Sequence, residues 1–239
     1  LGSFSSLIEK LKSHNIIVTP HSCTYDNSEV NISYEWAMLR AGIYNLGFIA
    51  TARSAETSAF LKWWQIRLRE YCYYLTQPGL FVDQIWVTLA QLYFKGFYVE
   101  KDPGYNMSYW NLFERLLSSD SGKYKVNKNH DLIFYHFSSY NPHSPEAITG
   151  RDSGEIIATF DERPDLQPLF DDYCKRMIDA GISDVSSIQC AYGRRDTPKL
   201  KEKPKLISVQ SAKDIVNALL RISLRVIPKR VRMCLKNNL

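Results

Sequence analysis

Residues 131–138, DLIFYHFS, constrain the fold more than any other stretch, because they are apolar or aromatic on both alternating faces. Such a run predicts a β-strand that is buried on both sides, as in the interior of an α/β protein. The alternation places Leu132 and Phe134 on one face and Ile133, Tyr135 and Phe137 on the other.

This predicted strand carries a histidine, His136, near its end. An imidazole in a dry interior needs a hydrogen-bond partner, because an unpaired buried polar group destabilises the fold. Two interpretations stay open on these residues alone. The first is a core histidine bonded to a neighbouring hydroxyl or carbonyl group, and the second is a functional ligand.

Helical and strand patterns alternate along the rest of the chain, with connections of variable length. This intermixing predicts an α/β or α+β core, with a mixed sheet flanked by helices, rather than a helical bundle or a β-sandwich. With 45% apolar residues, a chain of 239 residues can form one core, or one core with a subdomain. Strands are predicted at 15–20, 44–51, 97–100, 124–127 and 131–139, and helices at 6–14, 34–42, 55–75, 83–94 and 165–180.

Composition divides the chain into three predicted regions. Residues 1–150 carry the α/β pattern, residues 151–200 form an irregular and helical extension, and residues 201–239 form a basic linker and tail with an amphipathic helix at 211–227. From residue 211 to residue 239 there are seven basic side chains and one acidic one, so this tail carries a charge of +6. The net charge of the whole chain is +5, so the remaining residues sum to −1. Apolar residues interleaved with arginines are typical of helices on a membrane surface, and packing on its own domain is the alternative.

The cysteines and the charge distribution indicate the cellular compartment and the kind of partner. Five scattered cysteines contain no C-x-x-C pair, so neither a zinc module nor a disulfide scaffold is predicted, and a reducing cytoplasm fits best. No apolar run reaches the roughly 18–20 residues of a membrane span. We expect a cytoplasmic protein whose tail, 211–239, contacts the inner face of a membrane. Because the rest of the chain is nearly neutral, nucleic acid is not an expected partner.

Common phosphate-loop, nucleophile-elbow and zinc-protease motifs do not occur, and four polar clusters stand out instead. Asn45 and Gly47 interrupt a predicted strand, where glycine marks a bulge or a close approach by a ligand. Asp83 and Gln84 begin a predicted helix, where the aspartate is either an N-cap or a sugar ligand. The turn DPGYNMSYWN at 102–111 carries aromatic rings and amides that suit a sugar ring or that pack on one another. The histidine of the predicted strand is the fourth.

In chain order, N-x-G, D-Q, P-G-Y-N-x-x-Y-W-N and H-F-S resemble the C-terminal half of a GT-A-type nucleotide-sugar glycosyltransferase, in particular family eight and related bacterial enzymes. The similarity covers residues 1–142. It implies a Rossmann-like GT-A fold, a nucleotide-sugar donor, a glycan or lipid-linked acceptor, and transfer with retention of configuration. Together with the basic tail, it suggests a part in the assembly of cell-envelope polysaccharide.

The resemblance assigns a role to each motif. Asn45 and Gly47 would line the sugar pocket, and Asp83 and Gln84 would contact the donor sugar near its anomeric carbon, as the catalytic candidates. His136 would complete the coordination of a divalent ion that offsets the charge of the departing diphosphate. One imidazole among oxygen ligands favours Mn²⁺ over Mg²⁺. The acceptor-side candidates are Tyr105, Asn106, Tyr109 and Trp110.

Two features depart from the family pattern. Ser139 and Pro142 stand where family eight has glycine and lysine, so a phosphate-binding lysine is missing at that point. The Asp-x-Asp motif that ends the nucleotide-binding half does not occur in the 239 residues, which begin with Leu1 rather than Met. We therefore expect a fragment that is incomplete as an enzyme, with Asp-x-Asp encoded upstream. The alternative is a non-catalytic carbohydrate-binding or regulatory protein derived from the same fold.

Overall fold

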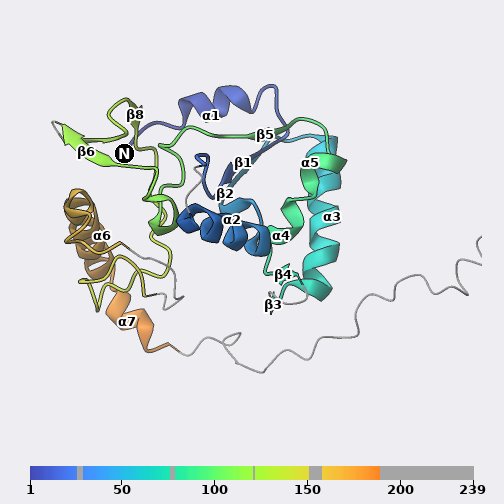
Figure 1. Ribbon diagram of the computed structural model, residues 1–239. Coiled ribbons are helices and arrows are strands. Elements are labelled where there is room, and N and C mark those ends of the chain that lie inside the picture. Colours follow the sequence, from blue (N-terminus) through green and yellow to red (C-terminus); the bar gives the residue numbers. More distant parts are fainter. Residues whose placement is uncertain (26–28, 76–78, 121, 151–157, 189–239) are drawn as a thin grey trace, which may run out of the picture. The chain divides into compact units, whose positions relative to one another are not determined.

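The computed structural model describes residues 1–25, 29–75, 79–120, 122–150 and 158–188 (Figure 1). These residues form a mixed α/β fold with small mixed and antiparallel sheets flanked by helices. The predicted fold class is therefore confirmed at this coarse level. The basic tail and its predicted amphipathic helix lie outside the described residues. Every helix in the described part is too short or too polar to cross a bilayer.

The central sheet has three strands. Strand β1 (Ile16–Pro20) lies in the middle, antiparallel to β2 (Tyr44–Thr51) and parallel to β5 (Phe97–Val99). The predicted strands at 15–20, 44–51 and 97–100 are thus confirmed. The apolar run of β1 is fully buried because both faces of the sheet are covered.

Alternate residues of β1 serve different cores. Ile16 and Val18 pack with Phe60 and with apolar residues of the helices that follow β2. Ile17 points to the other face, where it packs with Leu7. The short helix α1 (Ser5–Lys10) therefore covers one face of the sheet, while α3, α4 and α5 cover the other (Figure 1). The bounds of these three helices are Ala55–Tyr71, Gln84–Val87 and Ala90–Tyr93.

Four predicted helices differ from the observed ones. The helix predicted at 6–14 spans only Ser5–Lys10. Helix α2 spans Glu29–Ala41 and begins before the predicted residue 34. The helix predicted at 55–75 ends at Tyr71, because Tyr74–Leu75 (β3) pairs antiparallel with Leu80–Phe81 (β4). The helix predicted at 83–94 is two short helices, α4 and α5, separated at 88–89, where a β-branched residue weakens the helical preference.

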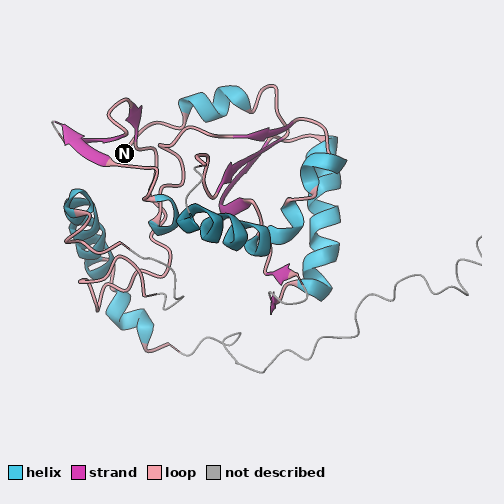
Figure 2. Cartoon of the chain, viewed as in Figure 1, coloured by secondary structure: helices cyan, strands magenta, loops and turns pink. Residues whose placement is uncertain are grey.

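The strand predicted at 131–138 is wrong. Only His130–Asp131 (β8) is a strand, and it pairs with β7 (Lys123–Val126), which pairs in turn with β6 (Leu117–Asp120). The following residues run beside an irregular turn rather than a strand, with one isolated bridge between Met107 and Tyr135. Figure 2 shows loop through most of this part of the chain.

The predicted division of side chains between two faces is also wrong, although burial on two sides is observed. Ile133 and Phe134 pack together in the α1 core. Leu132, Tyr135 and Phe137 pack in a third core that includes α6. The side chains do not alternate strictly between two faces, because the neighbouring turn does not form a continuous ladder of hydrogen bonds with this segment. Ile133 N donates to Gly104 O (2.8 Å), and His136 N donates to Met107 O (2.8 Å).

The third core is closed by the last described helices. The 3₁₀ turn η2 (Pro164–Leu166) leads into α6 (Gln167–Asp179), which confirms the helix predicted at 165–180, and α7 (Ile182–Ser186) follows. Phe170 of α6 packs edge-on against Tyr135, with ring centroids 5.2 Å apart. This helix therefore supports the segment that carries the predicted site histidine.

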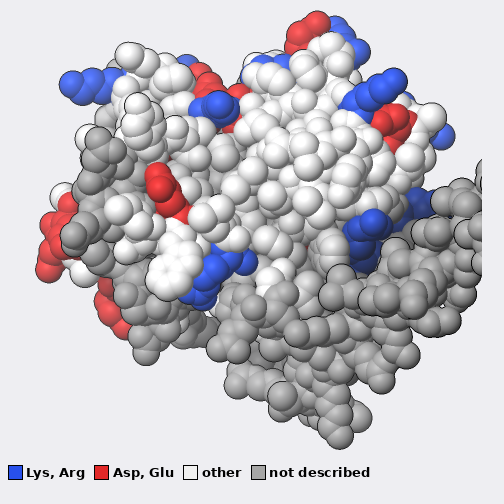
Figure 3. All heavy atoms as spheres, turned by 45° about the vertical axis from the view of Figure 1, so that its right-hand side comes forward, with Lys and Arg blue, Asp and Glu red and all other residues white. Residues whose placement is uncertain are grey.

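Part of the described surface is apolar. Figure 3 shows a broad uncharged surface with lysine, arginine, aspartate and glutamate side chains mostly along its margins. On α2, Ile32, Trp36 and Leu39 are exposed at a spacing that places them on one face of the helix. Arg40 lies over the Trp36 ring, 6.0 Å from its centroid.

Candidate functional site

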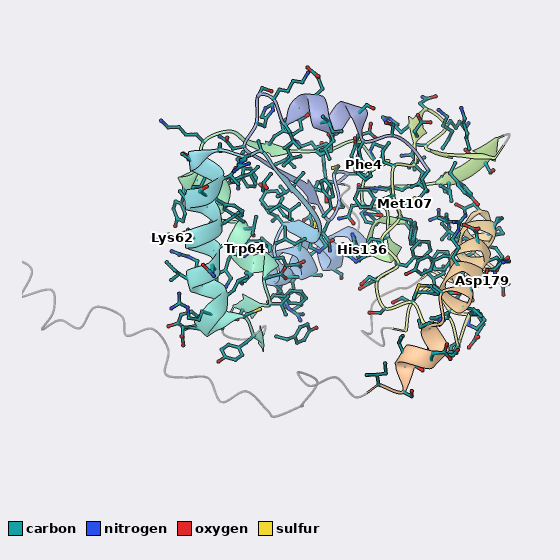
Figure 4. All side chains as sticks on the ribbon, turned by 180° about the vertical axis from the view of Figure 1, so that it is seen from behind. Phe4, Lys62, Trp64, Met107, His136 and Asp179 are labelled. Atoms are coloured by element: carbon teal, nitrogen blue, oxygen red, sulfur yellow. The ribbon has the colours of Figure 1, made fainter. Side chains whose placement is uncertain are left out.

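Polar side chains from four separate segments meet beyond the end of β1. They are His21 after β1, Asn45 in β2, Asn106 in the turn at 102–111, and His136. We call these four residues the histidine–asparagine cluster. Figure 4 shows His136 between the side of the molecule that carries Lys62 and Trp64 and the side that carries Asp179.

Gly47 lies in a bulge of β2 that faces His136. Val18 is opposite Ile49 and Thr19 is opposite Asn45, so residues 46–48 have no partner in β1. A Cβ atom on Gly47 would lie 2.0 Å from His136 Nδ1, which is far inside van der Waals contact. The predicted bulge is confirmed, and the close approach comes from an imidazole of the same chain. Because Gly47 is exposed and His136 half-buried, the cluster reaches the surface here.

Asn106 links the turn to both sides of the cluster. It is fully buried and has a φ of 53°, a left-handed conformation that asparagine tolerates better than most residues. Its Nδ2 donates to Thr19 Oγ1 (2.8 Å) and to Asn45 Oδ1 (3.0 Å). Its Oδ1 lies 3.2 Å from His136 Nδ1. The hydrogen-bond partner that a core histidine requires is therefore a side-chain amide, rather than a hydroxyl or a backbone carbonyl group.

Asn45 extends the contacts to the second imidazole. Its Oδ1 accepts the Gly47 N–H at 2.9 Å, and its Nδ2 lies 3.2 Å from His21 Nε2. Asn45 is buried, so its amide orientation is fixed by these partners rather than by solvent. The strand interruption N-x-G thus holds both histidines.

The indole of Trp110 lies against both imidazoles. Its ring centroid is 5.7 Å from that of His21 and 5.1 Å from that of His136, and both contacts are edge-to-face. Its buried Nε1–H has no hydrogen-bond partner in the described part of the chain. Trp110 is half-buried, so this apolar ring forms one wall of the cluster near the surface.

Burial lowers the pKa of His136 below the usual histidine value. A neutral imidazole is the form that binds a metal ion or accepts a proton. The lowered pKa therefore favours the form of His136 that a metal ligand requires.

Gln84 ties α4 to the bulge in β2. Its Nε2 donates to Ala41 O at 3.0 Å, and its Oε1 accepts from Leu46 N at 3.5 Å. The structure thus brings Gln84 next to Leu46, which lies between the predicted site residues Asn45 and Gly47.

Asp83 occupies the N-cap position of α4, but its side chain makes no capping hydrogen bond, so the N-cap interpretation of its carboxylate is not supported. The residue before it, Val82, has a φ of 41°, which is strained for a β-branched side chain. The Asp83 carbonyl oxygen accepts from Trp64 Nε1 at 3.0 Å. Burial raises the pKa of Cys72, and the nearby Asp83 charge raises it further, which places the carboxylate on the side of that thiol.

The acceptor-side candidates divide into buried and accessible residues. All three of Tyr105, Asn106 and Tyr109 are buried. Tyr105 lies in the α1 core and Tyr109 in the third core, whereas Asn106 belongs to the cluster. Trp110 alone of the four is partly exposed. A direct contact with an acceptor is therefore available to Trp110, and the other three assignments stay predictions.

A divalent ion would find one nitrogen ligand here. His136 fits as a ligand because its imidazole is neutral and lies at the surface end of the cluster. Among the residues that the structure describes, no three His, Cys, Asp or Glu side chains gather into a metal-binding group. An ion at His136 would need further ligands besides these residues.

The sequence did not single out His21 or Thr19 as site residues. Both lie at or just after the end of β1, in the stretch VTPHS. Polar residues that directly follow a buried strand are a usable signal, since ligands bind beyond the carboxyl ends of strands in α/β sheets. Asn111 was visible in the turn motif, and its side chain holds the turn by donating to Asn106 O (3.1 Å) and His21 O (3.2 Å).

Comparison with known proteins gives one distant relative. The chain is 32% identical over 99 residues to the uncharacterized protein YfnF of Bacillus subtilis, which is 41% of this chain and 33% of the relative. The aligned part is thus about a third of that relative's length. No protein-family profile matches the chain, and no solved structure matches it.

Proposed function

We propose that this chain is the sugar- and acceptor-binding part of a GT-A-type glycosyltransferase, which transfers a sugar from a nucleotide diphosphate to a glycan or lipid-linked acceptor. The observation that supports the proposal is the contact between Gly47 and His136. It joins the N-x-G and H-F-S motifs of the resemblance, and Asn106 of the P-G-Y-N motif bonds to both. Motifs far apart in the chain thus meet at one point.

In this proposal His136 presents an unprotonated nitrogen toward the donor diphosphate. A bound divalent ion, with Mn²⁺ favoured over Mg²⁺, would supply charge stabilisation of the leaving group. Trp110 contributes an indole wall on which a sugar ring can stack. Gln84 holds the bulge that carries Gly47, and Asp83, which makes no capping bond, is the carboxylate left for the sugar hydroxyls. Such contacts raise the rate only where they tighten in the transition state.

The cytoplasmic location, the membrane contact of residues 211–239 and the role in cell-envelope polysaccharide stay predictions. They rest on the composition of the tail, which lies outside the described residues. The alignment covers only 33% of the relative's length, so the activity of the whole protein is likewise a proposal.

The proposal is tested with the gene product that contains this chain. Release of nucleoside diphosphate is measured from a panel of nucleotide sugars with Mn²⁺, and products are followed with oligosaccharide and lipid-linked acceptors. We expect His136→Gln to lower turnover by at least 100-fold, in line with the loss of one stabilising group at a reacting phosphate. The matched control is His130→Gln, since His130 is an exposed histidine that pairs with Asp102 at 3.2 Å, away from the cluster.

Two outcomes would contradict the proposal. The first is the absence of turnover with every donor, and glycan binding without turnover would then favour the non-catalytic carbohydrate-binding protein. The second is equal loss of turnover in the His136 and His130 variants.

A further inference from the structure

We infer that Asn45 and Asn106 are positioning residues that fix the tautomer of His136, with the proton on Nδ1 and the lone pair on Nε2. The site histidine then offers only Nε2 to a ligand. The tautomer is a property of this chain by itself, and its use at a diphosphate site rests on the proposed function.

The first step is the orientation of the Asn45 amide. Amide oxygen and nitrogen are told apart by their hydrogen-bond partners. The Gly47 backbone N–H can only donate, and it points at the Asn45 side chain over 2.9 Å. The atom that it meets is therefore the oxygen, Oδ1, and the nitrogen of the same amide points to His21.

The second step is the orientation of the Asn106 amide. One of its two side-chain atoms faces Asn45 Oδ1 at 3.0 Å and the Asn45 backbone oxygen at 3.4 Å. Both are acceptors, so the facing atom is the nitrogen, Nδ2. The Asn106 oxygen, Oδ1, is left to face His136 Nδ1 at 3.2 Å.

The third step follows for His136. An amide oxygen can only accept, so His136 Nδ1 must carry a proton and donate it. In the neutral imidazole the other nitrogen, Nε2, then holds the lone pair.

The same series of hydrogen bonds extends through Asn45 to the second histidine, His21. Asn45 Nδ2 donates, so His21 Nε2 accepts across the 3.2 Å that separates them. Reversing the Asn106 amide would place its oxygen against two oxygens of Asn45. Reversing the Asn45 amide would place its nitrogen against the Gly47 N–H. The backbone groups of Gly47 and Asn45 therefore set the direction of every hydrogen bond in this series, from His136 to His21.

The tautomer is measured by ¹⁵N NMR of the labelled 239-residue chain, in which two-bond couplings identify the protonated nitrogen of each imidazole. His136 is assigned by its loss in His136→Gln. We expect Nδ1–H for His136 in the unmodified chain at pH 7. A proton on Nε2, or a rapid mixture of both tautomers, overturns the inference.

A variant tests the cause. Asn106→Gly removes the amide and keeps the left-handed backbone, since glycine adopts positive φ freely. We expect His136 to become a mixture of tautomers. The matched control, Thr19→Val, removes the hydroxyl that contacts Asn106 Nδ2 and the Asn45 backbone oxygen. The Gly47 N–H and the Asn45 carbonyl group stay in place, so His136 should keep its Nδ1 proton. An unchanged tautomer in Asn106→Gly, or an altered one in Thr19→Val, overturns the assignment of the anchors.

If Asn106→Gly does not fold, Asn106→Asp replaces it. Both carboxylate oxygens can only accept, so an aspartate at this position still requires a proton on His136 Nδ1, and that proton should be kept. A proton found on Nε2 alone overturns the inference. The outcome is separable from the proposed function, because the tautomer can be Nδ1–H in a protein that transfers no sugar, and turnover can be found in a protein whose His136 carries the proton on Nε2.

Discussion

The central sheet and the turn segment at 102–116, which precedes β6, form the hydrogen bonds of their buried backbone groups in different ways. In the sheet, β1 is paired on both sides by β2 and β5, and its side chains pack in apolar cores. In the turn segment, buried side chains replace the missing strand partners. Arg115 donates to Pro103 O (3.0 Å) and Tyr105 O (2.7 Å).

A second arginine continues this pattern. Arg163 donates to Leu112 O (2.8 Å) and Arg115 O (2.8 Å), and its guanidinium pairs with both carboxylate oxygens of Asp165. Nearly all buried carbonyl groups in proteins are hydrogen-bonded, and a segment without a sheet partner must use side chains. The comparison teaches that the folded structure of the turn segment is stabilised by a few buried polar residues, whereas the sheet is stabilised by many small apolar contacts.

The largest effect is expected for Arg115→Ala. The Arg115 and Glu114 side chains are only 2% and 4% exposed, with Arg115 Nε 3.2 Å from Glu114 Oε1. Truncation leaves a buried carboxylate without its cation and two carbonyl groups without donors. We expect a loss of about 3–5 kcal/mol in the free energy of unfolding, measured by urea denaturation.

An exposed arginine provides the contrast. Arg176 pairs with Asp172 one turn earlier on α6, and both side chains are largely in water. Arg176→Ala should leave the urea midpoint unchanged within error. A similar loss in both arginine variants would break the comparison, because it would mean that the turn segment gains nothing special from its buried arginine.

A smaller effect is expected on the sheet side. Ile17 is fully buried in the middle of β1. Ile17→Val removes one methyl group and should lower the free energy of unfolding by about 0.5–1.5 kcal/mol, with no change in the NMR signals of His136. Altered His136 signals in this variant would show that the sheet and the cluster are not independent, which would weaken the contrast between the two regions.

The smallest effect is the pH dependence that His136 contributes. Its pKa is lowered in the folded state, so the unfolded chain binds more protons once the pH falls below the unfolded histidine value of about 6.5. Stability from this group is complete above that pH and decreases as the pH falls toward the folded pKa. We expect urea midpoints between pH 7 and pH 5 to fall less steeply in His136→Gln. An equal slope in the variant would mean that other groups carry the dependence.

Local patterns predicted the regular elements and the glycine bulge. The bounds of β2 and the position of α6 follow from periodicity, and Gly47 inside an apolar strand indicated the bulge that is observed. The error at 131–138 has a physical reason. An apolar stretch with buried faces looks the same whether its neighbour is a strand or an irregular turn, and only the neighbour's hydrogen bonds decide which it is.

The sequence by itself determined which residues interrupt or border apolar segments, because such positions are visible in the order of side chains. They are Asn45, Gly47, Gln84, Asn106 and His136. The tertiary structure decided what these residues touch. Contacts between distant segments bring Gly47 so close to His136 that a Cβ atom would lie 2.0 Å from its Nδ1. They also bury Asn106 and orient the amides between the two histidines. Hydrogen-bond direction depends on every partner being in place, so it exists only in the folded chain.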